Sequence, residues 1–177
     1  MKKLFNVRVI ALMGIFIALD VLLTGVFAIN TPLMRITFNY LPRTFLGVLF
    51  GPFGAFVATF TSGITNDLLF PNNPFFIGFP LSAGVVGLLF GYFFYQKEVT
   101  LKRIILATIV ISILQSLVFT PLNLYLLYQT PYASIFIPRV IRLLITIPIQ
   151  ICLTYWIVPK VLCVHGVQRF VSNYKIY

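Results

Sequence analysis

Six apolar runs follow one another along the chain, separated by short polar segments or by proline and glycine. A helical crossing of a bilayer takes about 20 apolar residues. The second run, residues 41–50, is too short to cross alone, and we count it with the segment before it as a short or broken span. The pattern therefore predicts an all-α membrane protein, a bundle of six transmembrane helices that forms a single domain over residues 1–177. The expected spans are residues 5–28, 38–50, 53–70, 75–95, 104–127 and 135–164.

Proline and glycine mark where these runs break. Thr31-Pro32 closes the first run, and Gly51-Pro52 separates two short runs, because proline lacks an N–H and restricts the residue before it. Pro148 is expected to kink or interrupt the sixth helix. Polar and apolar residues alternate from Arg35 to Tyr40, and this period of two predicts an extended segment or a tight cap.

Composition narrows the class of protein further. Of 177 residues 60% are hydrophobic and 9% are charged, and the mean hydropathy is +1.02, which excludes a water-soluble domain. Six spans leave no room for a separate catalytic domain, so most enzyme classes are excluded too. The start, Met1 to Lys3 before an apolar run, resembles a secretory signal, but the run is long and contains Asp20, so we expect a retained first helix.

Basic residues set the expected orientation in the membrane. The chain has thirteen Lys and Arg but only three Asp and Glu, which gives a formal charge of +10. We attribute this excess to the orientation of the chain in the membrane rather than to nucleic-acid binding. Six crossings with both termini in the cytoplasm place nine of the thirteen inside the cell. These nine are Lys2, Lys3, Arg8, Lys97, Lys102, Arg103, Lys160, Arg169 and Lys175.

Four arginines then fall in the outer half of the membrane, against the positive-inside bias: Arg35, Arg43, Arg139 and Arg142. An arginine in hydrocarbon costs several kcal/mol unless it pairs, snorkels or lines a wet cavity. Only Asp20 and Asp67 are expected in the same half, so two of the four arginine charges have no acidic partner there. The surplus predicts a site for an anion with carboxylates or phosphates, and snorkelling to lipid headgroups is the alternative.

Arg139 and Arg142 are spaced i, i+3 and share a face near the start of the last helix. Steps of four from Arg142 give Thr146 and Gln150, a polar stripe that descends into the membrane. The stripe indicates either ligand contacts or interhelical hydrogen bonds.

The end of the third span carries a second group of polar residues, Asn66 and Asp67. A carboxylate that accepts paired N–H donors is what an amino-substituted heterocycle such as a pterin requires, and an ion pair between Asp67 and an arginine is the alternative. Asp20 is expected to be structural, since it lies inside an aliphatic run and needs a partner. Of the aromatic residues beside these loops, Phe76 is a candidate for stacking on a flat ring.

Small residues predict two close helix contacts. Gly84, Gly87 and Gly91 form a stripe on the fourth span, and Ala11, Gly14 and Ala18 suit docking of the first helix against another membrane subunit. No Gly-Lys pair occurs, so the chain has no P-loop and cannot hydrolyse ATP by that route. No cluster of His, Cys and acidic residues indicates a metal site, and we expect neither a metal nor a catalytic centre.

Several segments together resemble a known family, the folate-specific substrate-binding S components of energy-coupling factor (ECF) vitamin transporters. The segments, within residues 11–150, are Thr31 to Phe38, Leu41-Pro42, Gly51 to Ala55, Phe70 to Phe79, Pro138-Arg139 and Ile147 to Gln150.

The resemblance implies a six-helix protein of the bacterial plasma membrane that captures a vitamin from outside. It also implies association with a transmembrane T component and two ATPases, which bind the ATP, so that this chain needs no cofactor. The first helix would dock through Ala11, Gly14 and Ala18, although Ile15 departs from the usual small-residue pattern, and the loop 31–38 would gate the site with Arg35 facing the ligand.

Folate agrees with the separate charge argument, because it joins a dianionic glutamate to a flat pterin. Our hypothesis assigns Arg35, Arg139 and Arg142 to the carboxylates, Arg43 less directly, and Asn66 or Asp67 with aromatic residues to the pterin. Alternatives are an S component for another anionic or aromatic vitamin, a small membrane enzyme that acts on an anionic lipid, and an autonomous anion carrier.

Overall fold

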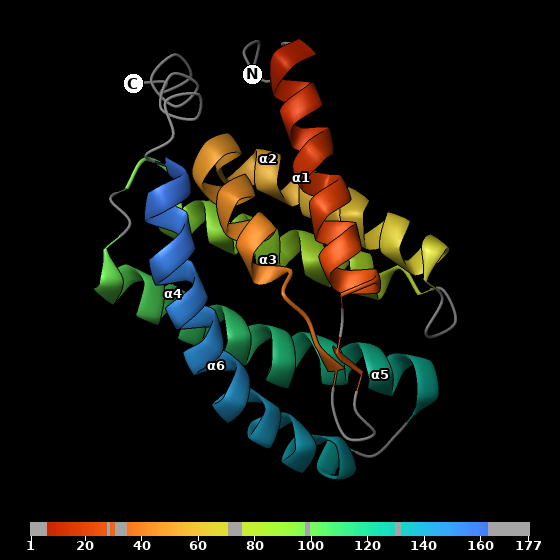
Figure 1. The fold of residues 1–177 in the computed structure, drawn as a ribbon. Helices are drawn as coiled ribbons and strands as arrows, with labels where there is room; N and C mark the ends of the chain where they lie inside the picture. The colour runs from red at the N-terminus through yellow and green to blue at the C-terminus, as the bar shows by residue number, and fades with distance from the viewer. Residues whose placement is uncertain are drawn as a thin grey trace.

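The computed structural model describes residues 7–27, 29–30, 35–70, 76–97, 100–129 and 132–162. Apart from one two-residue strand pair, its regular elements are helices (Figure 1). Three of them are long and apolar enough to cross a membrane, at Tyr40–Leu69, Leu101–Tyr128 and Arg139–Val158, and two more are shorter apolar helices. An all-helical membrane protein is therefore confirmed at this level of detail.

The first group of helices consists of α1 (Val7–Gly25), α2 (Tyr40–Leu69) and α3 (Gly78–Phe94). Between α1 and α2 the chain forms the antiparallel strands β1 (Ile29–Asn30) and β2 (Arg35–Ile36). The extended segment expected from the alternation is thus present at its beginning, but the helix already starts at Tyr40.

The spans predicted at 38–50 and 53–70 correspond to the two arms of α2. At Gly51 the backbone leaves the helical region, with φ 73° and ψ −176°, and Pro52 follows (Figure 1). Glycine tolerates a positive φ, and proline disfavours a helical residue before it, so the helical geometry is interrupted at this pair of residues and two helical arms meet there. The predicted break between the two runs is therefore present, as a sharp kink.

The second group contains one long run and α6 (Tyr132–Leu162). The long run is α4 (Leu101–Ile113), the π-helical segment η1 (Leu114–Phe119) and α5 (Thr120–Tyr128), which together correspond to the predicted span 104–127. The expected interruption at Pro148 is wrong, because α6 continues through it. Pro148 and Leu144, four residues before it, are both exposed, so the ring and the lost hydrogen bond fall on the outer side of the helix.

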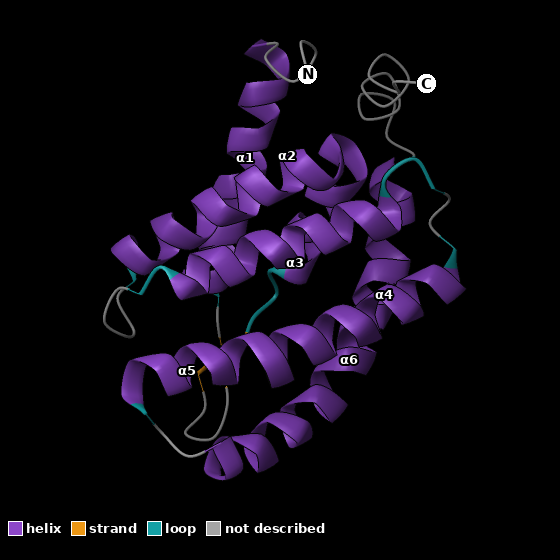
Figure 2. Ribbon diagram, turned by 180° about the vertical axis from the view of Figure 1, so that it is seen from behind, coloured by secondary structure: helices purple, strands orange, loops and turns teal. Residues whose placement is uncertain are grey.

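The two groups lie beside each other with the same ends aligned (Figures 1 and 2). One end of the molecule holds the start of α1, the kink of α2, the end of α3 and the start of α4. The other end holds the end of α1, the two ends of α2, the start of α3 and the junction of α5 with α6. This second end is where the polar residues singled out in the sequence converge.

Glycines allow α2 and α3 to approach closely, as their spacing predicts. A Cβ at Gly87 would collide with Thr59 and with the carbonyl oxygen of Ala55, and one at Gly91 would collide with the backbone of Pro52. In a membrane the hydrophobic effect does not drive helices together, because the surrounding lipid is itself apolar. Close backbone packing of this kind supplies van der Waals contact instead. On α3, Val86, Phe90 and Phe94 are at most 1% exposed and belong to a buried cluster with Tyr40 of α2 and with Ile104, Ala107 and Ile111, which follow α3 in the chain.

A buried ion pair joins α1 to α2. Arg43 Nε lies 3.2 Å from Asp20 Oδ1, its Nη2 lies 3.4 Å from Oδ2, and Ser62 donates a hydrogen bond of 2.5 Å to Oδ2. Asp20 and Ser62 are 1% exposed and Arg43 is 5% exposed. The structural role expected for Asp20 is thereby confirmed, and the residues come from α1 and from both arms of α2.

Replacing Asp20 with alanine is expected to destabilise the isolated protein by about 3–5 kcal/mol, because it leaves a buried guanidinium without its counterion. Thermal unfolding in detergent measures the effect. The double variant Asp20→Leu with Arg43→Met should recover most of the loss, since neither charge is then buried alone. A single variant as stable as the wild type would contradict the role of the pair.

Gly91→Ala is expected to lower stability by about 1–3 kcal/mol, because the added methyl group must displace the α2 backbone. Gly14→Ala is the matched control, since nothing lies within 4 Å of a Cβ at that position. The two melting temperatures in the same detergent test the difference, and equal values would show that close α2–α3 contact is not needed.

Candidate functional site

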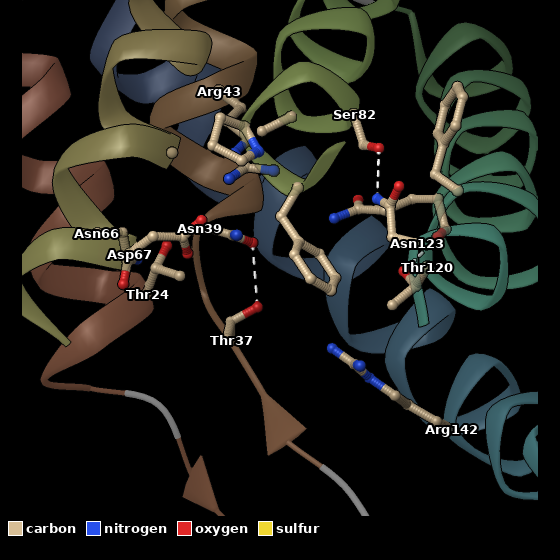
Figure 3. A pocket seen from close by; sticks show the side chains of 16 residues that line it. Thr24, Thr37, Asn39, Arg43, Asn66, Asp67, Ser82, Thr120, Asn123 and Arg142 are labelled. Carbon is tan, nitrogen blue, oxygen red and sulfur yellow. Dashed lines mark hydrogen bonds between the residues drawn. The ribbon is translucent and has the colours of Figure 1, made fainter. Parts of the chain in front are cut away.

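A cavity of about 230 Å³ lies between the two groups of helices, at the end where α1 finishes and α6 begins (Figure 3). Every helix of the described structure except α4 contributes to it, and we call it the ligand pocket. Its lining residues are Thr24, Thr37, Asn39, Arg43, Gly63, Asn66, Asp67, Phe79, Pro80, Ser82, Ala83, Gln115, Phe119, Thr120, Asn123 and Arg142.

One wall of the ligand pocket is formed by the end of α2 and the end of α1. Asn66, Asp67 and Thr24 lie together there (Figure 3). The helix ends immediately afterwards, where the Phe70 N–H donates to the Asn66 carbonyl oxygen at 2.8 Å. Two of the residues predicted for the heterocycle, Asn66 and Asp67, therefore line one cavity side by side.

Arg142 lines the ligand pocket from α6, across from Asp67 and Asn66 in the close-up (Figure 3). Polar residues of the chain before α2 lie between these two sides, where Thr37 Oγ1 donates to Asn39 Oδ1 at 3.2 Å. The pocket is thus cationic at one side and carries an acid and an amide at the other. A ligand that spans the pocket would contact a guanidinium at one end and a carboxylate with an amide at the other.

Arg43 also lines the ligand pocket, but its charge is already neutralised. Asp20 accepts from Nε and Nη2, one edge of the guanidinium. Of the arginines assigned to an anion, Arg43 is therefore the least suited to supply net positive charge. Because Asp20 neutralises Arg43, the positive charge that remains for an anion lies on α6.

A hydrogen-bonded cluster on α3 and α5 forms the third wall. Asn123 Nδ2 donates to Ser82 Oγ at 2.8 Å and to the Gly78 carbonyl at 3.1 Å, and Ser82 Oγ donates to the same carbonyl at 2.7 Å. These contacts fix the Asn123 side chain, which is 4% exposed. Sequence reasoning missed this cluster, although a polar residue inside an apolar span, as at Ser82 and Asn123, was a usable signal.

The π-helical segment supplies the remaining polar lining. The Thr120 N–H and Oγ1 both donate to the Gln115 carbonyl, five residues earlier, the hydroxyl at 2.6 Å. This wider turn brings Gln115, Phe119 and Thr120 to the pocket together. Segments of this kind occur often at functional sites.

Three further predicted residues lie near the ligand pocket without lining it in the described structure. Phe76 packs edge-on against Phe79, with ring centroids 6.2 Å apart, and Phe79 is the ring that lines the cavity. Arg139 lies on α6 three residues before Arg142, and its Nε and Nη1 are buried without a hydrogen-bond partner among the described residues. Gln150 lies beyond Arg142, where its Oε1 accepts a hydrogen bond of 3.1 Å from Ser112.

The backbone of Arg35 forms β2, whereas its side chain lies outside the described part of the structure. Ala11, Gly14 and Ala18 are exposed on one side of α1, away from the buried Val9 and Asp20. The predicted docking face is therefore open on the molecule.

Comparisons with known proteins agree with one another. The family model described as "ECF transporter, substrate-specific component" matches residues 8–158. Folate transporter FolT of Clostridium novyi (strain NT) is 34% identical over 155 residues, which cover 88% of each chain, and folate transporter FolT of Streptococcus mutans is 29% identical over 143 residues, which cover 77% of this chain and 76% of that protein.

A solved structure gives the same result in three dimensions. The crystal structure of FolT bound with folic acid superposes with a TM-score of 0.82 and 39% sequence identity, and the match covers 88% of this chain and 95% of that chain. Sequence and fold therefore place this chain among the substrate-specific components of ECF transporters.

Proposed function

We propose that this chain is the folate-binding membrane subunit of an ECF transporter, and that it delivers folate for uptake driven by ATP in partner subunits. The observation that carries the proposal is the ligand pocket, which has Arg142 on one side and Asn66 with Asp67 on the other. The relatives named folate transporter and the fold of FolT with folic acid support the same ligand.

The chemistry of folate complements the two sides of the ligand pocket. Its glutamate carries two carboxylates, and arginine binds a carboxylate through two parallel hydrogen bonds. Arg142, with Arg139 one turn away and Arg35 on β2, is assigned to this end. The pterin presents N–H donors that Asp67 and Asn66 accept, and Phe79, supported edge-on by Phe76, offers a flat face.

Other vitamins fit this arrangement less well. Thiamine is a cation and would lie beside Arg142 and Arg139 with the wrong sign of charge. Riboflavin is neutral and brings no carboxylate for the arginine side of the pocket to bind. The charge distribution favours a ligand that is anionic at one end and flat and hydrogen-bonding at the other.

We infer that the chain crosses the cell membrane six times, with both termini in the cytoplasm and the pocket facing outward. This count takes the two arms of α2 as separate crossings on either side of Gly51. The exposed Lys97, Lys102 and Arg103 lie at the end opposite the pocket, and the positive-inside rule puts that end in the cytoplasm.

Transport itself requires partners in this proposal. The family implies a transmembrane T component and two ATPases, and the sequence carries no P-loop of its own. The open small-residue face of α1, at Ala11, Gly14 and Ala18, is the proposed contact with the T component. The isolated chain should therefore bind one folate without turning it over, unlike an enzyme, and without moving it across a membrane, unlike a carrier.

Arg142→Ala is expected to weaken folate binding by about 1–3 kcal/mol, or roughly 5- to 150-fold, because a desolvated charge-assisted hydrogen bond is lost. Titration of the purified chain by calorimetry measures the affinity, with thiamine and riboflavin as control ligands. Lys102→Ala is the control variant, since Lys102 is exposed at the opposite end. Unchanged affinity in Arg142→Ala would show that this arginine does not bind folate and would favour its interaction with lipid headgroups.

Asp67→Asn is expected to weaken folate binding by about 1–2 kcal/mol, because the carboxamide replaces a charged acceptor with a neutral one and puts a donor in its place. Asp67→Glu, which keeps the charge, should lose less. The same titration tests both variants, and an Asn variant that binds as the wild type does would show that Asp67 does not receive the heterocycle.

A further inference from the structure

The end of the molecule opposite the ligand pocket, where α3 ends and α4 begins, carries basic side chains on its surface (Figure 1). Lys97 follows α3, Lys102 and Arg103 lie in the first turn of α4, and all three are exposed. Glu98 is the one acidic residue in this stretch of the sequence. The stretch is therefore positively charged, and we call Lys97, Lys102 and Arg103 the basic patch.

Two exposed aromatic side chains lie at the same end, beside the kink of α2. Phe53 is 66% exposed and follows Pro52, and Tyr92 is 64% exposed and follows Gly91. The backbones of Pro52 and Gly91 pack so closely that a Cβ at Gly91 would collide with Pro52. Phe53 and Tyr92 therefore lie at one level, as the aromatic residues of a membrane interface do.

The structure holds one ammonium group of the basic patch at this level. Lys97 Nζ donates to the Tyr92 carbonyl oxygen at 3.1 Å and lies 4.9 Å from the centroid of the Tyr92 ring. This position suits the end of α3, because a helix carries a partial negative charge at its C-terminus. An ammonium group has three donors, and the bond to the carbonyl uses one of them. The charge of Lys97 is therefore fixed beside an exposed aromatic ring.

The two cations at the start of α4 are in the opposite situation. The N-terminal end of a helix carries a partial positive charge, which favours an acidic residue in the first turn. The first turn of α4 has none, and the side chain of its N-cap residue Thr100 makes no capping hydrogen bond. Lys102 and Arg103 add positive charge where α4 is already positive. An anion from outside the chain would be attracted by both side chains and by the end of the helix.

Aliphatic side chains lie one turn deeper than the two aromatic rings. Val57 is four residues after Phe53 on α2, Leu88 is four residues before Tyr92 on α3, and they are 41% and 40% exposed. After its kink α2 leads away from this end, whereas α3 leads toward it, so both aliphatic residues lie nearer the middle of the molecule (Figure 1). The surface thus changes from aliphatic to aromatic to basic, which matches the acyl chains, the interface and the phosphate of a phospholipid. A soluble anion would contact the basic residues alone.

We propose that the basic patch binds the headgroups of anionic phospholipids, with Tyr92 and Phe53 level with the headgroup region and the aliphatic residues against the acyl chains. Each Lys or Arg near an anionic lipid surface strengthens the attraction by a factor of about 5 in affinity. The three residues of the basic patch together therefore favour an anionic lipid over a zwitterionic one. The orientation inferred above puts these lipids in the cytoplasmic leaflet, and this assignment alone rests on the proposed function.

Thermal unfolding of the purified chain in a neutral detergent compares two short-chain lipids. Dioctanoyl-phosphatidylglycerol is anionic, and dioctanoyl-phosphatidylcholine has the same chains with a zwitterionic headgroup. We expect the first lipid to raise the melting temperature at concentrations at least about 10-fold lower than the second. Salt at about 1 M should reduce the difference, because the charges are exposed. Equal effects of the two lipids would overturn the inference.

Inorganic phosphate at the same concentrations distinguishes a lipid from a free anion. We expect it to leave the melting temperature unchanged, because it has no acyl chains to contact the aliphatic residues. A rise as large as that with dioctanoyl-phosphatidylglycerol would show that the basic patch holds an adventitious ion only, and would overturn the inference too.

Variants of the two lysines test the basic patch itself. Lys97→Gln combined with Lys102→Gln is expected to raise the phosphatidylglycerol concentration needed for the same shift by at least about 10-fold, since two of three charges are lost. Lys97→Arg combined with Lys102→Arg is the matched control, which keeps both charges and should respond as the wild type does. Both double variants should bind folate with wild-type affinity, because neither lysine lines the ligand pocket. An unchanged lipid response of the glutamine variant would contradict the role of the patch.

The two readouts separate this inference from the proposed function. A chain that prefers phosphatidylglycerol but does not bind folate would refute the proposed function and leave the lipid contact standing. A chain that binds folate but responds equally to both lipids would leave the proposed function standing and refute the lipid contact.

Discussion

The contact between Asp20 and Arg43 is the constraint on which the ligand-binding end of the molecule depends. Neither charge is stable alone in a membrane interior, so each residue fixes the other, and Ser62 ties the pair to the second arm of α2. The end of α1 and both arms of α2 are thereby held at one point. Arg43 is also part of the wall of the ligand pocket, so the pair that secures these helices also shapes the cavity.

The remaining walls depend on contacts of a different kind. Glycines let α3 lie against α2, and the cluster of Gly78, Ser82 and Asn123 joins α3 to α5 through neutral hydrogen bonds. Charge thus lies at the α1–α2 contact, at Asp67 near the end of α2 and at the arginines of α6, with uncharged polar groups between them. A ligand with an anionic end and a neutral ring is matched by this division, and a ligand with uniform charge is not.

Sequence reasoning found the features that have a local signal. Apolar runs located the helices, Gly51-Pro52 located the kink, and the isolation of Asp20 in an aliphatic run predicted its need for a partner. The Asn123 cluster joins residues 41 and 45 positions apart, and no local pattern encodes that pairing. The continuity of α6 at Pro148 likewise depends on which face of the helix is exposed, which becomes known only once the helices are packed.

The π-helical segment between α4 and α5 makes the exact chain length important at this place. An α-helix turns by about 100° per residue, so the loss of one residue from Leu114–Phe119 would convert the wide turn to an ordinary one and rotate everything after it by that angle. Thr120 and Asn123 would then face away from the cavity while the helix itself remained intact. A single-codon deletion in this segment would thus erase one wall of the binding site.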